Sequence, residues 1–293
     1  MVPCPMSDCP KILITGATDG IGQRAALDLA RSGAHLILTA RSEAKAARTR
    51  AAIEEAAPGT HVDVHFVDFS DLAAVVTTGK AIAAQHPRID VLINNAGLHA
   101  FEQRVTKDGY AEMIAVNYFA PWLLTDTLRE TLVHSAPSRI VTIGSEASRR
   151  SGDLDLERDL LDTALFTAPG SSRIYGRTKL LNIMFSLELA RQLRWTGVAV
   201  NCLCPGFNVT GLGRELHFAR PLATVLNWLG IGNPERGAGG IVRLATHQGF
   251  GQQTGAYVSA RNARPLTPVT PADSEEARRQ LWEKTTETLA RFR

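Results

Sequence analysis

No apolar run in this sequence of 293 residues is long enough to cross a membrane. A spanning helix needs about 18 or more apolar residues in succession. Residues 1–10, which we interpret as an N-terminal tail, also lack the apolar centre of a secretory signal. We therefore expect a cytoplasmic protein. The alternative is contact with a membrane surface through residues 208–231 and the C-terminal helix, where large apolar side chains occur beside Arg and Lys.

Cysteine and net charge are also scarce. The four cysteines form two close pairs, Cys4 with Cys9 and Cys202 with Cys204. A chain of this length rarely depends on a disulfide framework, and no partner pair stands near to complete a zinc site, so we expect reduced thiols and no metal. The formal net charge is only +3, and no stripe of Lys and Arg accompanies it. This gives no case for a nucleic-acid partner.

Residues 11–41 contain the pattern on which the rest of the interpretation depends. Two apolar runs flank a turn with Gly16, Gly20 and Gly22 and a helical, Ala/Leu-rich segment. Without side chains at these glycines, the backbone can approach a pyrophosphate and begin a helix whose N–H groups face the anion. The spacing predicts dinucleotide binding by a turn that comprises Thr15, Gly16, Thr18, Asp19, Gly20, Ile21 and Gly22.

Strand and helix patterns alternate along the rest of the chain. Further strands are predicted over 61–67, 88–93, 138–144, 197–204 and 255–259. Helices are predicted over 43–57, 71–85, 107–134, 172–195, 234–248 and 271–292. This order indicates an α/β protein with a Rossmann, doubly wound parallel sheet of about seven strands and helices on both faces. No linker interrupts it, so we expect one domain over residues 11–293.

The end of the second strand predicts which cofactor is bound. A carboxylate at this point of a dinucleotide fold would bind the ribose 2′-hydroxyl, whereas a guanidinium would bind a 2′-phosphate. Residues 39–42 contain Arg41 and no acid, which favours NADP(H) over NAD(H). Asp19 is a counter-signal, because its carboxylate lies in the glycine turn and would repel the same phosphate.

Three polar residues later in the sequence, Ser145, Tyr175 and Lys179, suggest acid/base chemistry. Tyr175 and Lys179 are four apart on a predicted helix and share one face. An ammonium beside a phenol lowers its pKa from about 10 toward the range in which it can exchange protons. Ser145 ends the fifth strand, at the carboxyl edge where open α/β sheets bind ligands. Its hydroxyl could hold a substrate oxygen.

Five motifs thus follow one another between about residues 11 and 259. They are Thr15-Gly16-x-x-x-Gly20-x-Gly22, Asn94-Asn95-Ala96-Gly97, Ser145, Tyr175-x-x-x-Lys179 and Pro205-Gly206. Together they resemble the short-chain dehydrogenase/reductase family. Residues 39–41, 116–119 and 255–257 are similar to its retinol-dehydrogenase-like branch.

The resemblance implies a role for each matching residue. Tyr175 would pass a proton to a carbonyl oxygen while hydride leaves the nicotinamide, Lys179 would bind the nicotinamide ribose, and Ser145 would orient the carbonyl. The remaining cofactor contacts that the resemblance implies are Asp68, Phe69, Asn94, Asn95, Ala96, Gly97, Pro205, Gly206, Asn208 and Thr210. Asn208 and Thr178 depart from the usual family residues, a branched apolar residue and a serine.

Asn117 occupies the family's fourth active-site position. Proline at position 121 has no N–H, so the carbonyl of Asn117, four residues earlier, loses its helical donor. We hypothesise that this carbonyl holds a water in a proton relay with Lys179. Alternatively, Pro121 is a plain kink or lies near the start of a helix.

Two segments are expected to shape the substrate site. Residues 149–171 form a polar insert between Ser145 and Tyr175 and predict an extra loop over the site, and residues 208–231 occupy the family's substrate-lid position. The apolar side chains of the lid indicate a bulky apolar ketone or aldehyde, unless they only pack on the domain. The helix 172–195 is apolar nearly all round, which favours a homodimer.

We therefore predict an NADPH-dependent carbonyl reductase or alcohol dehydrogenase with Tyr175 as general acid/base. One alternative within enzymes is reduction of a carbon–carbon double bond. The alternative outside enzymes is a non-catalytic NADP(H)-binding sensor. Such a sensor needs only the glycine turn, so the presence of Ser145, Tyr175 and Lys179 argues against it.

Overall fold

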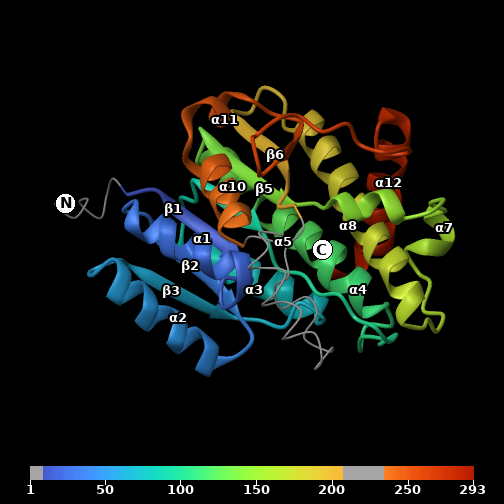
Figure 1. Ribbon diagram of the computed structural model, residues 1–293, viewed down its shortest axis with the longest axis horizontal. Coiled ribbons are helices and arrows are strands. Elements are labelled where there is room, and N and C mark those ends of the chain that lie inside the picture. The colour runs from blue at the N-terminus through green and yellow to red at the C-terminus, as the bar shows by residue number, and fades with distance from the viewer. Residues whose placement is uncertain (1–8, 207–233) are drawn as a thin grey trace.

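The seven strands of the sheet are all parallel and follow the order β3-β2-β1-β4-β5-β6-β7 (Figure 1). They are β1 (Lys11–Thr15), β2 (His35–Ala40), β3 (Val62–Phe66), β4 (Val91–Asn94), β5 (Ser138–Ile143), β6 (Val198–Cys204) and β7 (Ala256–Ser259). This computed structural model describes residues 9–206 and 234–293. The predicted Rossmann sheet is confirmed. The predicted lid over 208–231, with Asn208 and Thr210, lies outside the described residues.

Helices cover both faces of the sheet because alternate strand residues point to opposite sides. Ile12 and Leu36 pack with one group of helices, and Leu13 and Ile37 pack with the other. The first group contains α1 (Gly20–Arg31), α2 (Glu43–Ala56), α10 (Pro234–Thr246) and, after it, α11 (Gln248–Gln252). The second group contains α3 (Leu72–Gln85), α5 (Ala120–Thr127) and α8 (Ala168–Gln192).

The predicted helix 107–134 is divided at Pro121. It consists of α4 (Glu112–Ile114), a π-helix η1 (Ala115–Phe119), α5 and α6 (Arg129–His134). The N–H of Ala120 donates to the carbonyl of Ala115, five residues earlier. A proline cannot donate to the residue four positions back, and its ring clashes there, so the backbone widens by one residue per turn. Asn117 lies at the centre of this widened turn.

A C-terminal helix, α12 (Glu275–Thr288), packs along α8 (Figure 1). The rings of Phe185 and Trp282 stack with centroids 6.0 Å apart and an interplanar angle of 9°. Leu180 and Met184 on α8 are fully buried within the chain. The apolar side chains of α8, from which we predicted a homodimer, are thus packed in part against α12 of the same chain. The homodimer stays a prediction.

None of the helices in the described part of the chain combines the length and the apolar character needed to span a bilayer.

Candidate active site

The glycine turn after β1 is held against the loop that follows β4. The side-chain amide of Asn95 donates to the carbonyl oxygens of Thr15 at 2.8 Å and Gly16 at 3.2 Å. The Thr15 hydroxyl accepts from the backbone N–H groups of Asn95 and Ala96, each at 3.0 Å. A Cβ on Gly22 would lie 2.3 Å from the Asn95 amide nitrogen, so a larger residue would break this clamp. The turn, α1 and β4 are therefore fixed relative to one another, as a pyrophosphate site requires.

Asp19 serves the helix rather than standing free in the turn. Its carboxylate caps α1 by accepting from the N–H of Gly20 at 2.8 Å, and the ammonium of Lys45 on α2 pairs with it at 3.1 Å. Because its charge is balanced, Asp19 is a weaker obstacle to a 2′-phosphate than the sequence suggested. Arg41 is exposed directly after β2, on the same edge of the sheet. The residues present therefore fit a phosphorylated dinucleotide.

Other predicted cofactor contacts differ in how their side chains are used. Phe69 is 7% exposed and belongs to the core. Asn94 is buried and donates to the hydroxyl of Thr125 on α5 at 2.9 Å. Only the backbone of these two residues is thus available to a cofactor. Asp68 is exposed after β3, where its carboxylate accepts from the N–H and the hydroxyl of Ser70.

The remaining predicted positions lie at the same carboxyl edge. Thr18 and Ile21 are partly exposed at the glycine turn and the start of α1. Pro205 and Gly206 directly follow β6. The cofactor contacts predicted for these four residues stay predictions.

Asn117 ties the loop after β4 to α8. Its side-chain oxygen accepts from the N–H of Leu98 at 2.8 Å, and its amide donates to the carbonyl of Leu98 at 2.8 Å and to the hydroxyl of Thr178 at 3.0 Å. Thr178 in turn donates to the carbonyl of Tyr175 at 2.8 Å. Asn117 is fully buried, so it is a positioning residue whose side chain does not reach a substrate. The water relay from its carbonyl stays a prediction.

Lys179 is buried beneath this loop. Its ammonium donates to the carbonyl of Ile143 at 3.0 Å, and a Cβ on Gly97 would lie 3.7 Å from its nitrogen. Burial lowers the pKa of Lys179 to about 8, because the charged form loses hydration. Lys179 can therefore exchange a proton near neutral pH, as a relay needs.

Tyr175 differs from expectation in its ionisation. Its ring stacks on His99, with centroids 4.7 Å apart, and the Lys179 ammonium lies 5.6 Å from the ring centroid. Burial raises the pKa of Tyr175, with a further rise from nearby Cys204. The expectation that Lys179 lowers the pKa of Tyr175 is therefore wrong. The ammonium lies over the ring and bonds to the Ile143 carbonyl, so loss of hydration dominates.

Ser145 and Tyr175 are brought together by a close helix contact. Ser145 follows the end of β5 by two residues and caps the short helix η2 (Glu146–Arg150), accepting from the N–H of Ala147 at 3.1 Å. A Cβ on Gly176 would lie only 2.5 Å from the carbonyl oxygen of Ala147. The absence of a side chain at Gly176 thus lets α8 press its Tyr175 turn against the Ser145 turn. The motif spacing gave no sign of this role.

The insert 149–171 is anchored at two places. Asp159, in α7 (Leu156–Asp159), pairs with Arg177 of α8 at 2.9 Å, and both side chains are buried. At the other end, Ser171 lies 3.1 Å from the ring nitrogen of His99, which stacks on Tyr175. The insert therefore borders the candidate active site through Ser171, whereas its α7 segment is held against Arg177 of α8.

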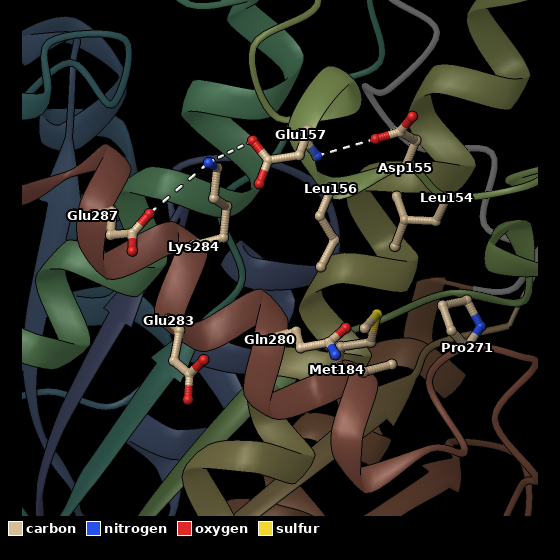
Figure 2. A pocket seen from close by; sticks show the side chains of 11 residues that line it. Leu154, Asp155, Leu156, Glu157, Met184, Pro271, Gln280, Glu283, Lys284 and Glu287 are labelled. Atoms are coloured by element: carbon tan, nitrogen blue, oxygen red, sulfur yellow. Dashed lines mark hydrogen bonds and ion pairs between the residues drawn. The ribbon is translucent and has the colours of Figure 1, made fainter.

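The middle of the insert forms one wall of a surface hollow (Figure 2). Glu157 pairs with Lys284 of α12 at 2.5 Å across its rim. The lining residues are Leu154, Asp155, Leu156, Glu157, Met184, Pro271, Ala277, Gln280, Glu283, Lys284 and Glu287. Met184 follows Tyr175 by nine residues, or about 13 Å along the helix. The hollow is thus separate from the candidate active site.

Comparison with known proteins agrees with this geometry. The sequence profile described as short chain dehydrogenase matches residues 10–154. The chain is 35% identical to retinol dehydrogenase 14 of Homo sapiens over 288 residues, covering 93% of this chain and 84% of the relative. It is 34% identical over 273 residues to dehydrogenase/reductase SDR family member 13 of Bos taurus, covering 92% and 71%.

One of the matching solved structures contains a bound cofactor. A candidate NAD(P)-dependent gluconate 5-dehydrogenase from Beutenbergia cavernae, with bound NADP at low occupancy, matches with a TM-score of 0.68 and 25% identity over 86% of this chain and 94% of the other. A nicotinamide cofactor and small-molecule oxidoreduction are therefore supported for this chain. The chain belongs to the short-chain dehydrogenase/reductase family of oxidoreductases, in its retinol-dehydrogenase-like branch.

Proposed function

We propose that this chain is an NADPH-dependent oxidoreductase that interconverts a bulky, apolar ketone or aldehyde with its alcohol. The observation that carries the proposal is the contact between Gly176 and Ala147, which holds the Tyr175 and Ser145 turns together. Lys179 lies one helical turn further along α8, beside Gly97. A proton donor, a hydroxyl that can bind a carbonyl oxygen and a titratable amine thus share one edge of the sheet.

Tyr175 is the proposed general acid in the direction of reduction. Its raised pKa keeps the phenol protonated at neutral pH, which is the form that can give a proton to a carbonyl oxygen. The Ser145 hydroxyl orients that oxygen and stabilises the charge that develops on it. Lys179, with its pKa near 8, resupplies the proton. NADPH, when bound along the glycine turn, supplies the hydride.

The choice of NADP(H) rests on the charges beside the glycine turn. Arg41 lies after β2, and Lys45 lies in the first turn of α2, where its ammonium pairs with Asp19 at 3.1 Å. Two cations and one capped carboxylate leave a net positive field where the 2′-phosphate would bind. This arrangement favours NADPH over NADH.

An apolar substrate is supported by the wall next to Tyr175. The rings of His99 and Phe101 are 4.7 Å apart and extend the stack that begins at Tyr175. Residues 208–231, which the sequence predicts to be a lid, include more large apolar residues. Flat aromatic and aliphatic surfaces bind extended apolar molecules and leave few polar groups for sugars or acids.

The test is NADPH oxidation, followed by its absorbance, with a panel of bulky apolar aldehydes and ketones and the matching alcohols with NADP⁺. Tyr175→Phe should lower kcat by about 10²–10⁴-fold, because it removes only the proton donor. Tyr110→Phe is the matched control, since its hydroxyl bonds to the Thr288 carbonyl at the C-terminal end and serves no part of the site. It should retain full activity.

Equal activity of Tyr175→Phe and the native protein would contradict the acid/base role. Preference for NADH in kcat/KM would contradict the cofactor assignment. Tight NADPH binding without turnover of any panel member in either direction would favour the sensor instead.

A further inference from the structure

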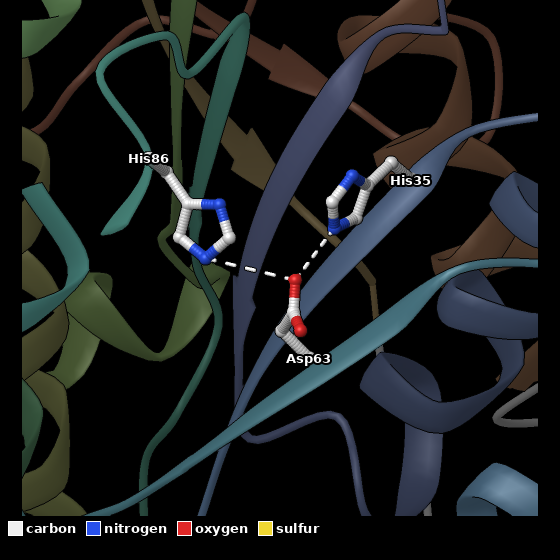
Figure 3. Close-up of side chains that lie close together, drawn as sticks. All are labelled: His35, Asp63 and His86. Carbon is white, nitrogen blue, oxygen red and sulfur yellow. Dashed lines mark hydrogen bonds and ion pairs between the residues drawn. The ribbon is translucent and has the colours of Figure 1, made fainter. Parts of the chain in front are cut away.

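Two histidines and an aspartate gather at the amino edge of the sheet, opposite the glycine turn. His35 begins β2, Asp63 lies near the start of β3, and His86 caps the C-terminus of α3. Figure 3 shows both imidazole rings directing a nitrogen at the Asp63 carboxylate. The nitrogens of His35 and His86 lie 2.7 and 3.7 Å from the same carboxylate oxygen. The candidate ligand atoms of the three residues all lie within 4.8 Å of one another.

Two more histidines surround this group. The ring nitrogen of His61 lies 3.5 Å from the same oxygen of Asp63, and its ring meets that of His35 edge-on at 4.3 Å. The ring of His65 is 5.9 Å from that of His86. Four of the eight histidines in the chain thus lie around one carboxylate, although they come from separate elements.

One ring nitrogen of His86 is buried without a hydrogen-bond partner among the described residues, as is one of the neighbouring His65. The side chain of His86 is 3% exposed, and its Nε2 makes no hydrogen bond to the described residues. A buried polar atom without a partner costs folding free energy, and such atoms are uncommon unless an ion or water completes them.

We propose that His35, Asp63 and His86 bind a divalent transition-metal ion, zinc above all, as three protein ligands, with the exposed His61 beside them. In a tetrahedral zinc site, ligands about 2.0–2.2 Å from the ion are about 3.3–3.5 Å from one another. The separation of 3.7 Å between His86 and Asp63 already suits this geometry, and the contact of 2.7 Å between His35 and Asp63 must open by less than about 1 Å.

The site is structural and separate from the proposed catalysis. It joins the starts of β2 and β3 to the end of α3, whereas Arg41 and the glycine turn lie at the other ends of the strands.

The test measures zinc in protein from which any polyhistidine tag has been removed. After treatment with a chelator and dialysis against zinc, the native chain should hold one ion per chain and melt at a higher temperature than the metal-free form. Cobalt should give the visible absorption of a tetrahedral site. His86→Gln and Asp63→Asn, which preserve side-chain size, should each lower zinc affinity at least about 100-fold.

Three controls distinguish this site from zinc bound elsewhere on the chain and from loss of the fold. His134→Gln removes an exposed histidine of α6 and should leave zinc affinity unchanged. The double variant Cys4→Ser, Cys9→Ser removes the two thiols nearest the start of the sequence and should also retain the ion. Circular dichroism and NADPH affinity check that His86→Gln and Asp63→Asn are folded.

Native protein that takes up no zinc, or folded His86→Gln and Asp63→Asn that bind it as tightly as the native chain, would overturn the proposal. Neither result would contradict the proposed oxidoreductase activity, because we expect the same kcat for the native protein with and without the metal.

Discussion

The two edges of the sheet hold their polar groups in different ways. At the carboxyl edge, Asn95 clamps the glycine turn mostly through backbone carbonyls and Ser145 caps its own short helix. At the amino edge, His35 and Asp63 meet side chain to side chain across 28 positions of sequence. The first arrangement leaves backbone N–H groups and loops open to a ligand, whereas the second directs side chains inward at one point.

This difference indicates what each edge can do. Backbone groups at the carboxyl edge fix a large, flat cofactor without dictating the substrate, and a single titratable pair on α8 supplies the chemistry. Converging imidazoles and a carboxylate suit a small cation and bring no reactive partner near it. Changes at the carboxyl edge should therefore alter catalysis, and changes at the amino edge should alter metal binding and stability alone.

Lys179→Met should separate catalysis from stability most strongly. We expect kcat to fall at least about 100-fold, because the proton relay is lost. At pH 7 the variant should nevertheless be about 1–3 kcal/mol more stable, since an ammonium with a pKa lowered to about 8 no longer has to be buried charged. Chemical denaturation at several pH values measures this.

The stability difference between Lys179→Met and the native protein should change with pH. Between pH 8 and 10.5 the unfolded chain binds a proton at Lys179 that the folded chain has released, so the native protein gains stability as pH rises through this window. The advantage of Lys179→Met is therefore complete below pH 8 and disappears toward pH 10.5. Lys80→Met, an exposed position on α3, should show no such dependence. A constant difference across pH would contradict the burial of a charged Lys179.

Gly176→Ala tests the contact that carries the proposed function. The new Cβ would meet the Ala147 carbonyl at 2.5 Å, and we expect about 1–3 kcal/mol of destabilisation and about 10–100-fold lower kcat as the Ser145 turn moves away. Gly239→Ala, on α10, is the matched control because its Cβ would meet nothing within 4 Å. It should be stabilising by about 0.5–1 kcal/mol with unchanged kcat. Normal kcat in folded Gly176→Ala would show that the contact is not required.

Arg41→Ala should have the smallest effect, which is confined to the affinity for the cofactor. Loss of one charged hydrogen-bond partner for the 2′-phosphate should raise the Kd for NADPH about 10-fold or more and leave that for NADH unchanged. Arg50→Ala removes the same charge from an exposed position further along α2 and should not discriminate between the cofactors. Fluorescence titration with both cofactors measures this, and equal weakening of both would point to a general charge effect.

Much of the carboxyl edge could be predicted because its motifs are local. Apolar runs such as residues 12–14 and 36–38 are long enough to specify buried parallel strands, and the glycines between them specify the turn. Ser145, Tyr175 and Lys179 follow because each lies at a fixed distance from a strand end or from another residue of the same helix. Single residues within these motifs were harder, since Phe69 and Asn94 turn their side chains into the core.

Sequence alone thus determined the order of strands and helices, the glycine turn, the spacing of the proposed catalytic residues and the positive charge at Arg41. These features could be predicted because periodicity and fixed spacing are properties of residues that are close together along the chain. Tertiary structure decided the rest. It set the π-turn at Asn117, the cover of α8 by α12, the raised pKa of Tyr175 and the meeting of His35 with Asp63. Each of these depends on burial and strand register, which join residues that are far apart along the chain.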